Sequence, residues 1–180
     1  MDNGACSYRR YLEGDDNGLR ELIDTYYDGL ALYLNAFLND GNDAEEAAEQ
    51  TFVTLATKKP AFKERALFKT FLYAIGRHTA LDLIRRKAAK RTEPLDPAVG
   101  SDEEDPAECF LREEKKKTLY RCMRKLKPEH RQVIWLFYFE EMSHQEAAAV
   151  MGKSENAADH LLRRARAALK QEMQKEGYTP

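Results

Sequence analysis

The stretch SHQEAAAVMGKSENAADHLLRRARAALK, residues 143–170, decides the fold of the second half of the chain. Ser143 and Glu146 have the spacing of a capping box, in which a serine oxygen and a glutamate carboxylate each bind a free amide at a helix start. Gly152 is suited to end this short helix, and Ser154 is suited to cap the next one. Two helices joined by about three residues form a helix-turn-helix.

The second helix of this pair, expected from Glu155 to about Met173, has two different faces. Its apolar positions recur at three- and four-residue steps and form a buried stripe of Ala158, Leu161, Leu162, Ala165, Ala168 and Leu169. Its outward positions are Asn156, Asp159, His160, Arg163, Arg166 and Lys170. Such a helix fits a DNA major groove, with N-terminal residues at base edges and later arginines at phosphates. We therefore expect Asn156 and His160 to contact bases.

Amphipathic helices with exposed arginines are common, and most of them are simply solvated surfaces. A plain helical hairpin is therefore the alternative to a DNA-binding module. The order of the features, with a capping box, a thin helix containing Ala147 to Ala149, a glycine and a capped basic helix, favours the helix-turn-helix.

The residues before this motif supply a hydrophobic core for it. Pro128 can occupy the first position of a helix without losing a hydrogen bond, and residues 133–139 form the most apolar stretch of the chain. A preceding helical stripe consists of Leu119, Cys122, Met123 and Leu126. The second domain is thus expected at 108–175.

The first half of the chain has the periodicity of three further helices. Apolar residues between Leu19 and Leu38 recur at three- and four-residue steps, which indicates a long amphipathic helix. Residues 39–42 form an expected turn, after which Asp43 is predicted to cap a second helix that ends near Lys59 and Pro60. The first domain is expected at 8–91.

The third helix, expected over 67–91, carries two surfaces. Its predicted buried face comprises Phe68, Phe71, Leu72, Ile75, Thr79 and Leu83, although Phe71 suits a functional role equally well. Lys69, Tyr73 and Arg77 align on another face, which we predict to be exposed. The last turns are strongly basic, and this cluster is either a solvated helix end or a DNA-binding patch.

Residues 92–107 differ in composition from the rest, since they are rich in proline and acidic residues and almost devoid of apolar ones. Such a segment cannot bury enough surface to fold, so we expect a flexible acidic linker. The predicted architecture is all-α, with two small helical domains joined by this linker.

Several other classes of protein are disfavoured. A net charge of −2 over 180 residues requires any DNA-binding surface to be local. The three cysteines and four histidines lack metal-ligand spacing, and a nucleophile–base pair and a phosphate-binding loop are absent. Signal-peptide and membrane-spanning patterns are absent as well. We expect a cytoplasmic protein that is not an enzyme and has no cofactor, metal ion or catalytic group.

Taken together, these motifs resemble a bacterial sigma factor of the extracytoplasmic-function group, the minimal sigma-70-type proteins that contain only regions two and four. The resemblance extends from about Tyr11 to Gln171. Asp43-Ala44-Glu45-Glu46 and Gln50-Thr51-Phe52 look like region 2.2, which docks on the clamp helices of the polymerase β′ subunit. The resemblance implies six contacts with core polymerase: Asp43, Glu46, Glu49, Gln50, Phe52 and Leu55.

The third helix looks like regions 2.3 and 2.4, which melt and recognise the −10 promoter element. The implied DNA-binding residues are Lys69, Phe71, Tyr73, Arg77, His78, Arg85, Arg86 and Lys87. Aromatic side chains next to cations suit this role, because single-stranded bases stack on rings and their phosphates need neutralising charge. The family usually has tryptophan at position 71 and asparagine at position 78, and both departures affect this surface.

The C-terminal module is similar to region 4, which binds the −35 element as duplex. The implied residues are Ser143, Ser154, Asn156, Asp159, His160, Arg163, Arg164 and Arg166. Asp159 and Leu161 occupy places where basic residues are common, so we expect phosphate contacts to shift toward the arginines. The implied partners are core RNA polymerase, through its β′ clamp helices and β flap, promoter DNA and an anti-sigma factor.

A second hypothesis is a helix-turn-helix transcriptional regulator whose first domain senses a ligand or a partner. The acidic motif that begins at Asp43 and the basic aromatic third helix argue against it, because a sensor domain needs neither. Binding to core RNA polymerase would distinguish the two hypotheses.

Overall fold

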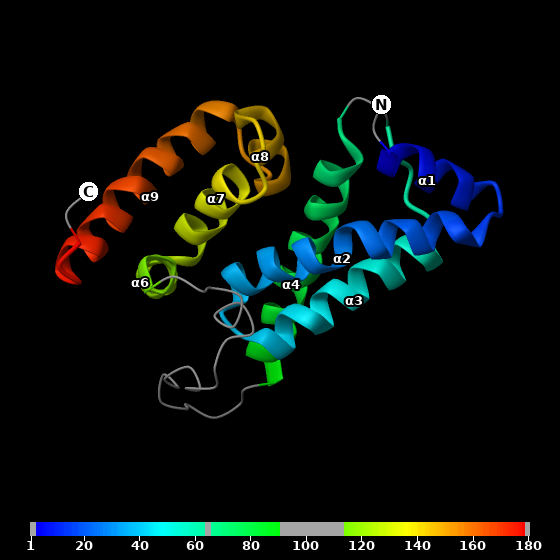
Figure 1. Ribbon diagram of the computed structural model, residues 1–180. Helices are drawn as coiled ribbons and strands as arrows, with labels where there is room; N and C mark the ends of the chain where they lie inside the picture. Colours follow the sequence, from blue (N-terminus) through cyan, green and yellow to red (C-terminus); the bar gives the residue numbers. More distant parts are fainter. Residues whose placement is uncertain (1–2, 64–65, 91–113, 179–180) are drawn as a thin grey trace.

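The computed structural model describes residues 3–63, 66–90 and 114–178, and every regular element in these ranges is an α-helix. The expected all-α class is confirmed. Figure 1 shows two groups of helices, α1 to α4 and α6 to α9, with the C-terminal end of the chain far from α1. The predicted acidic linker at 92–107 lies outside the described residues.

The first group consists of α1 (Asn3–Leu12), α2 (Asp16–Leu38), α3 (Gly41–Lys58) and α4 (Phe68–Lys90). The long α2 packs against each of the other three. Their shared core contains Leu22, Leu30, Tyr33, Leu34, Leu55, Phe68 and Leu72. The three helices expected in this half of the chain are therefore present.

Helix α1 was not predicted. It packs on α2 with two buried tyrosines, and their hydroxyls donate hydrogen bonds to carbonyls in the last turn of α3 and just beyond it. The Tyr8 hydroxyl binds the carbonyl of Pro60 at 2.8 Å, and that of Tyr11 binds the carbonyl of Ala56 at 2.9 Å. These bonds give α1 a structural role in closing the first domain.

The turn between α2 and α3 is tighter than predicted. Asn39 ends α2 in the left-handed conformation, with a φ of 57°. Asp40 then caps α3, because its carboxylate accepts a hydrogen bond from the amide of Asp43 at 2.9 Å. The prediction that Asp43 is the cap is wrong. Asp43 lies in the first turn, where its negative charge still favours the positive end of the helix.

The second group consists of α6 (Glu114–Arg124), α7 (Pro128–Tyr138), α8 (His144–Met151) and α9 (Glu155–Lys175). Both halves of the capping box between Ser143 and Glu146 form, and Gly152 ends α8 with a φ of 62°. The Ser154 side chain accepts from the amide of Ala157 and caps α9. The predicted helix-turn-helix is thus confirmed.

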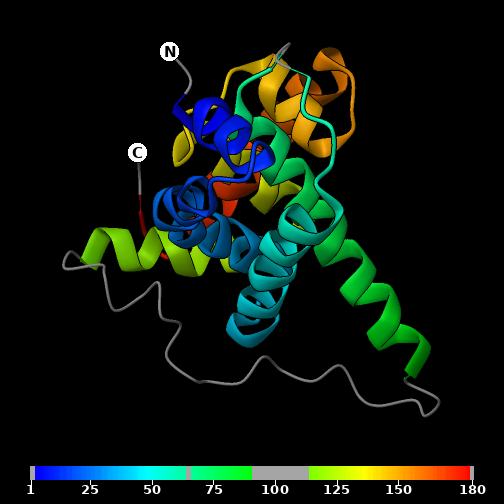
Figure 2. The same ribbon diagram turned by 90° about the vertical axis from the view of Figure 1, so that its right-hand side faces the viewer.

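The two groups pack against each other. Helix α7 packs against α2 and α8 packs against α4, and Figure 2 shows α8 beside the green α4. The buried Arg131 of α7 joins the two groups. Its guanidinium donates to the carbonyls of Ala36 (2.7 Å) and Phe37 (3.2 Å) in α2, and to those of Arg124 and Leu126 (both 2.9 Å). One cation therefore binds carbonyl groups near the ends of two helices.

Candidate nucleic-acid interface

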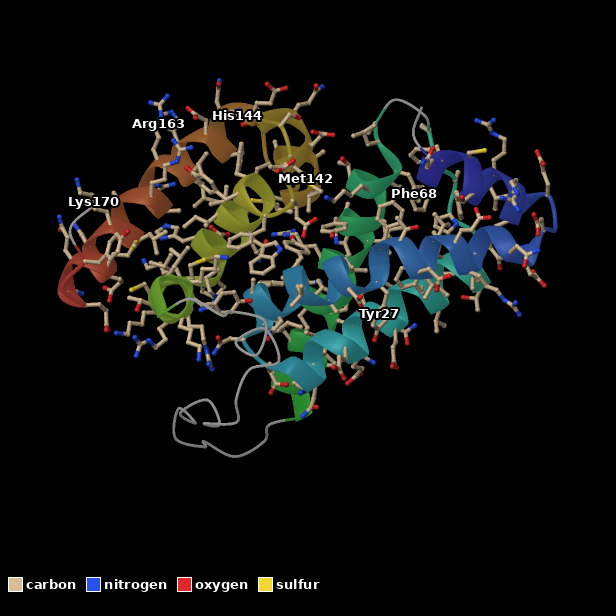
Figure 3. The ribbon with its side chains drawn as sticks, in the orientation of Figure 1. Tyr27, Phe68, Met142, His144, Arg163 and Lys170 are labelled. Carbon is tan, nitrogen blue, oxygen red and sulfur yellow. The ribbon has the colours of Figure 1, made fainter. Side chains whose placement is uncertain are left out.

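The outer surface of α8 and α9 carries the residues predicted to read duplex DNA. Asn156, His160 and the three arginines are exposed. Figure 3 shows His144 and Arg163 at the outer edge of this group, pointing away from the first domain. A surface depression is lined by Glu129, Lys153, Ala157, His160, Leu161, Arg163 and Arg164. Ser143 and Ser154 hold the N-termini of the two helices as caps.

Asp159 sets the electrostatics of this surface. Its carboxylate accepts from Arg163 at 2.7 Å, one turn later, and lies 3.6 Å from Nε2 of His144 on α8. Arg166 instead lies over the ring of Tyr138, with its guanidinium carbon 5.3 Å from the ring centre. Arg163 is therefore neutralised locally. Arg164 lies near His130, and the pKa of that imidazole is lowered by burial, by Lys127 and by Arg164.

The residues predicted to bind polymerase divide into two sets. Glu46, Glu49 and Gln50 are exposed on one side of α3, while Phe52 is only 6% exposed and Leu55 is fully buried. The expectation of a direct contact through Leu55 is therefore corrected, because its side chain belongs to the domain core. Val53, which is 49% exposed, continues the row of Glu46, Glu49 and Gln50 at helical spacing. Val53 was not among the residues predicted from the sequence.

The basic end of α4 is exposed, as predicted, and faces the first turns of α3. Lys87 forms an ion pair with Asp43, and Arg86 lies 3.7 Å from Glu46. Arg85 pairs with Asp82 in its own helix at 2.9 Å. Two predicted DNA-binding cations therefore lie next to two carboxylates predicted to bind polymerase. Such exposed pairs contribute little to stability, so they leave both sets available to partners.

Tyr73 is the largest departure from the predicted site. Its ring, expected to be exposed, is 1% exposed and stacks on Tyr33 with ring centres 5.3 Å apart. Its hydroxyl donates to Glu140 at 2.9 Å. Burial, together with the charge of Glu140, holds the pKa of Tyr73 far above its ordinary value. The helical pattern places Tyr73 correctly on a face distinct from Phe68, but that face is buried between α2, through Tyr33, and Glu140 of the second domain.

The other residues of the predicted −10 face have different environments. Lys69 forms an ion pair with Glu140 at 2.7 Å, and Arg77 donates through Nε to Gln132 at 3.0 Å. Phe71 is half-buried in a cluster of rings, 5.2 Å from Phe62 and 6.2 Å from Tyr8. Packing therefore accounts for Phe71, a position that the sequence left undecided. His78 is exposed.

Sequence reasoning missed Glu140, which lies just after α7 at the meeting point of the two domains. One of its carboxylate oxygens accepts from Tyr73 and Lys69, and the other accepts from the indole of Trp135 at 3.1 Å. No local pattern distinguishes it from Glu141. The information that identifies it is tertiary, since two of its three donors are on α4.

Neither a metal site nor a membrane-crossing helix is found in the described part of the chain. No group of three or more histidine, cysteine or acidic residues is placed to hold an ion within 3–63, 66–90 and 114–178. The helices of the same segments also fail to combine the length and the apolar character that a bilayer span requires.

Comparisons with known proteins match both halves of the chain. The family model described as Sigma-70 region 2 matches residues 22–90, and that described as Sigma-70, region 4 matches residues 116–169. The RNA polymerase sigma factor YlaC of Bacillus subtilis is 28% identical over 162 residues, covering 88% of this chain and 94% of its own length. NccH of Alcaligenes xylosoxydans xylosoxydans, also named an RNA polymerase sigma factor, is 29% identical, covering 89% of each chain.

The arrangement of helices is also similar to solved structures. The structure of CnrH in complex with the cytosolic domain of CnrY has a TM-score of 0.67 at 23% identity, covering 97% of this chain and 99% of that one. A single chain thus carries both sigma regions, in the order and with the helix-turn-helix that the fold displays. The chain belongs to the extracytoplasmic-function group of sigma-70-type RNA polymerase sigma factors.

Proposed function

We propose that this sigma factor binds its partners through three separate surfaces. The exposed face of α3 binds core polymerase, the face of α4 binds the opened −10 element, and α9 binds the −35 element as duplex. The functional units are proposed as 8–91 and 108–175, with 92–107 as the connection. The observation that carries the proposal is the pairing of a capped, exposed recognition helix with a second helix that combines aromatic and cationic side chains.

The direct test is run-off transcription from a genomic promoter library with holoenzyme reconstituted from this chain and bacterial core polymerase. We expect transcripts that share one pair of promoter elements. Asn156→Ala and His160→Ala should alter the −35 preference, because they remove base-edge contacts. Lys170→Ala, further along α9 and outside the proposed base contacts, is the matched control. Transcription that does not depend on this chain would refute the proposal.

The α3 surface can be tested separately by binding to core polymerase. Glu49→Lys reverses the charge of an exposed residue in the proposed contact row, so we expect much weaker binding. Asp24→Lys makes the same reversal on an exposed position of α2 and should have no effect. If both variants bind like the natural chain, the α3 assignment is wrong. A chain that binds promoter duplex but never binds core polymerase would instead be a simple regulator.

Two further proposals concern the setting of the protein. We place it in the cytoplasm, where core polymerase and the genome are found, and we assign it no enzymatic step of its own. We also propose that an anti-sigma factor controls it. The support is the similarity in fold to the sigma factor RpoE, solved in complex with the anti-sigma factor NepR from Bartonella quintana. Co-purification with this chain expressed in its native cell is the appropriate measurement.

A further inference from the structure

The carboxylate of Glu140 binds donors from both domains. Lys69 approaches it at 2.7 Å and the Tyr73 hydroxyl at 2.9 Å, both from α4, while the Trp135 indole donates at 3.1 Å from α7. Lys69 also donates to the backbone carbonyl of Glu140 at 3.1 Å. The Glu140 side chain is 9% exposed. A largely buried carboxylate is tolerated when its oxygens are satisfied in this way.

The surrounding packing favours this close approach. Position 29 on α2 is glycine, and a Cβ there would lie 2.8 Å from the Tyr73 hydroxyl and 3.9 Å from a carboxylate oxygen of Glu140. The absence of a side chain therefore leaves space for the Tyr73–Glu140 bond. Tyr73 is in turn held by its stack on Tyr33. Three helices, α2, α4 and α7, thus meet around a single acidic group.

We propose that Glu140 is a latch that holds the chain in a closed state, in which the −10 face of α4 is unavailable to DNA. This inference rests on the proposed role of α4. The carboxylate neutralises Lys69, which would otherwise be available to a phosphate, and it also holds the hydroxyl of Tyr73, whose buried ring stacks on Tyr33. Single-stranded DNA and Glu140 therefore compete for the same groups, and promoter opening requires release of the latch.

The interface contains a built-in reporter of this release. Trp135 is the only tryptophan of the chain, is 4% exposed and bonds directly to Glu140. Opening the interface would admit water and quencher to the indole. The emission maximum and acrylamide quenching of the full-length chain therefore follow the latch without any label, polymerase or promoter.

The test uses opposite charge changes on the two sides of the interface. Lys69→Glu places two carboxylates together and Glu140→Lys places two ammonium groups together, so each should shift the emission to longer wavelength and increase quenching at least twofold. Combining the two restores an opposite pair and should return the quenching toward that of the natural chain. Glu141→Lys, at the exposed neighbouring position, is the matched control and should change nothing.

Far-UV circular dichroism separates opening from unfolding. Lys69 is one-third exposed and makes its polar contacts across the interface, so Lys69→Glu should retain full helicity. Unchanged quenching in both single variants would overturn the latch. Quenching of Trp135 in the combined variant that is as strong as in the single variants would also overturn it. A loss of helicity large enough to account for the fluorescence change would do the same.

A linked measurement tests the consequence for DNA. If only the open state binds single strands, the apparent affinity scales with the open fraction. Loss of one charge-assisted bond in Glu140→Gln should then tighten binding of a fluorescein-labelled oligothymidine about tenfold. Glu141→Gln controls for the lost negative charge and should bind like the natural chain. Equal affinity for both variants would contradict the latch, whereas a failure of run-off transcription would contradict only the proposed function.

Discussion

The two candidate DNA-binding helices differ in how the free chain presents them. The recognition helix α9 has its polar face toward solvent, with Asn156 and His160 exposed. The first part of the −10 face of α4 is turned inward, with Tyr73 at 1% exposure and Lys69 bound to Glu140. A helix that reads closed duplex can remain accessible at all times. A helix that binds opened strands needs to be free only after the polymerase has reached the promoter.

The largest expected effect concerns Arg131, which joins the domains. Arg131→Ala leaves four backbone carbonyls without their charged donor, so the free energy of unfolding should fall by about 3 kcal/mol or more. Arg131→Lys should rescue little of it, since an ammonium group lacks the planar fork. Denaturant unfolding measures both. Arg121→Ala, at an exposed position, is the control. If Arg131→Ala lowers the free energy of unfolding by less than about 1 kcal/mol, Arg131 does not stabilise the contact between the domains.

A duplex-binding experiment tests whether α9 is accessible while α4 is covered. Because α9 is accessible in the closed state, Lys69→Glu should leave the affinity for −35 duplex unchanged, while Asn156→Ala should weaken it by about 1–3 kcal/mol. Arg163→Ala should cost less than Arg164→Ala, because Asp159 already neutralises Arg163. Fluorescence anisotropy with a duplex from the promoter library gives these values. A strong effect of Lys69→Glu would show that the closed state hides both helices.

The caps of the helix-turn-helix should have a medium effect on stability. Ser143→Ala removes the capping box of α8 and Ser154→Ala removes the cap of α9, so each should lower the free energy of unfolding by about 1 kcal/mol. Calorimetry can measure both changes. Ser7, whose hydroxyl donates to Glu21 on the surface, provides a control through Ser7→Ala. Equal losses of unfolding free energy in all three variants would mean that the two caps stabilise the fold no more than an ordinary surface hydrogen bond does.

The ion pairs at the basic end of α4 should contribute less. Asp43→Asn removes the partner of the exposed Lys87, so the free energy of unfolding should change by less than about 1 kcal/mol. Polymerase binding should weaken if Asp43 contacts the clamp helices directly. Unfolding and pull-down measurements on one preparation separate the two effects. A large stability change would show that this end of α4 is structural.

The smallest expected effect is a pH dependence. Burial, with Lys127 and Arg164, lowers the pKa of His130 below its ordinary value of 6.5. The folded state therefore binds fewer protons than the unfolded state, and this contribution to stability is present above about pH 6.5 and decreases as the pH falls below it. His130→Gln should flatten the slope. His78→Gln, at an exposed position, should leave it unchanged.

Much of the fold could be predicted because it depends on local signals. The capping box at Ser143, the end of α8 at Gly152 and Pro128 at the start of α7 occur as expected. The cap of α3 was misplaced, since Asp40 and Asp43 are equally good candidates in sequence and only the turn at Asn39 chooses between them. Helix α1 was missed because its packing depends on tyrosine hydroxyls that bind distant carbonyls.

The candidate sites were predictable to a lesser degree. The exposed row of Glu46, Glu49 and Gln50 and the outward face of α9 follow from helical period, but exposure of Phe52, Leu55 and Tyr73 depends on what lies over each helix. Periodicity tells which residues share a face. It does not tell whether that face meets solvent, its own domain or another domain.

The sequence by itself determined the helices α2 to α4 and α7 to α9, the caps of α8 and α9 and the resemblance to sigma regions 2 and 4, because these depend on residues within a few turns of one another. Only the tertiary structure decided that the −10 face of α4 is covered and that Glu140 joins Lys69, Tyr73 and Trp135. The physical reason is that a buried charge must be satisfied by whichever donors the fold brings to it. Lys69 and Tyr73 lie 71 and 67 residues before Glu140 in the chain, so no local pattern links them to it.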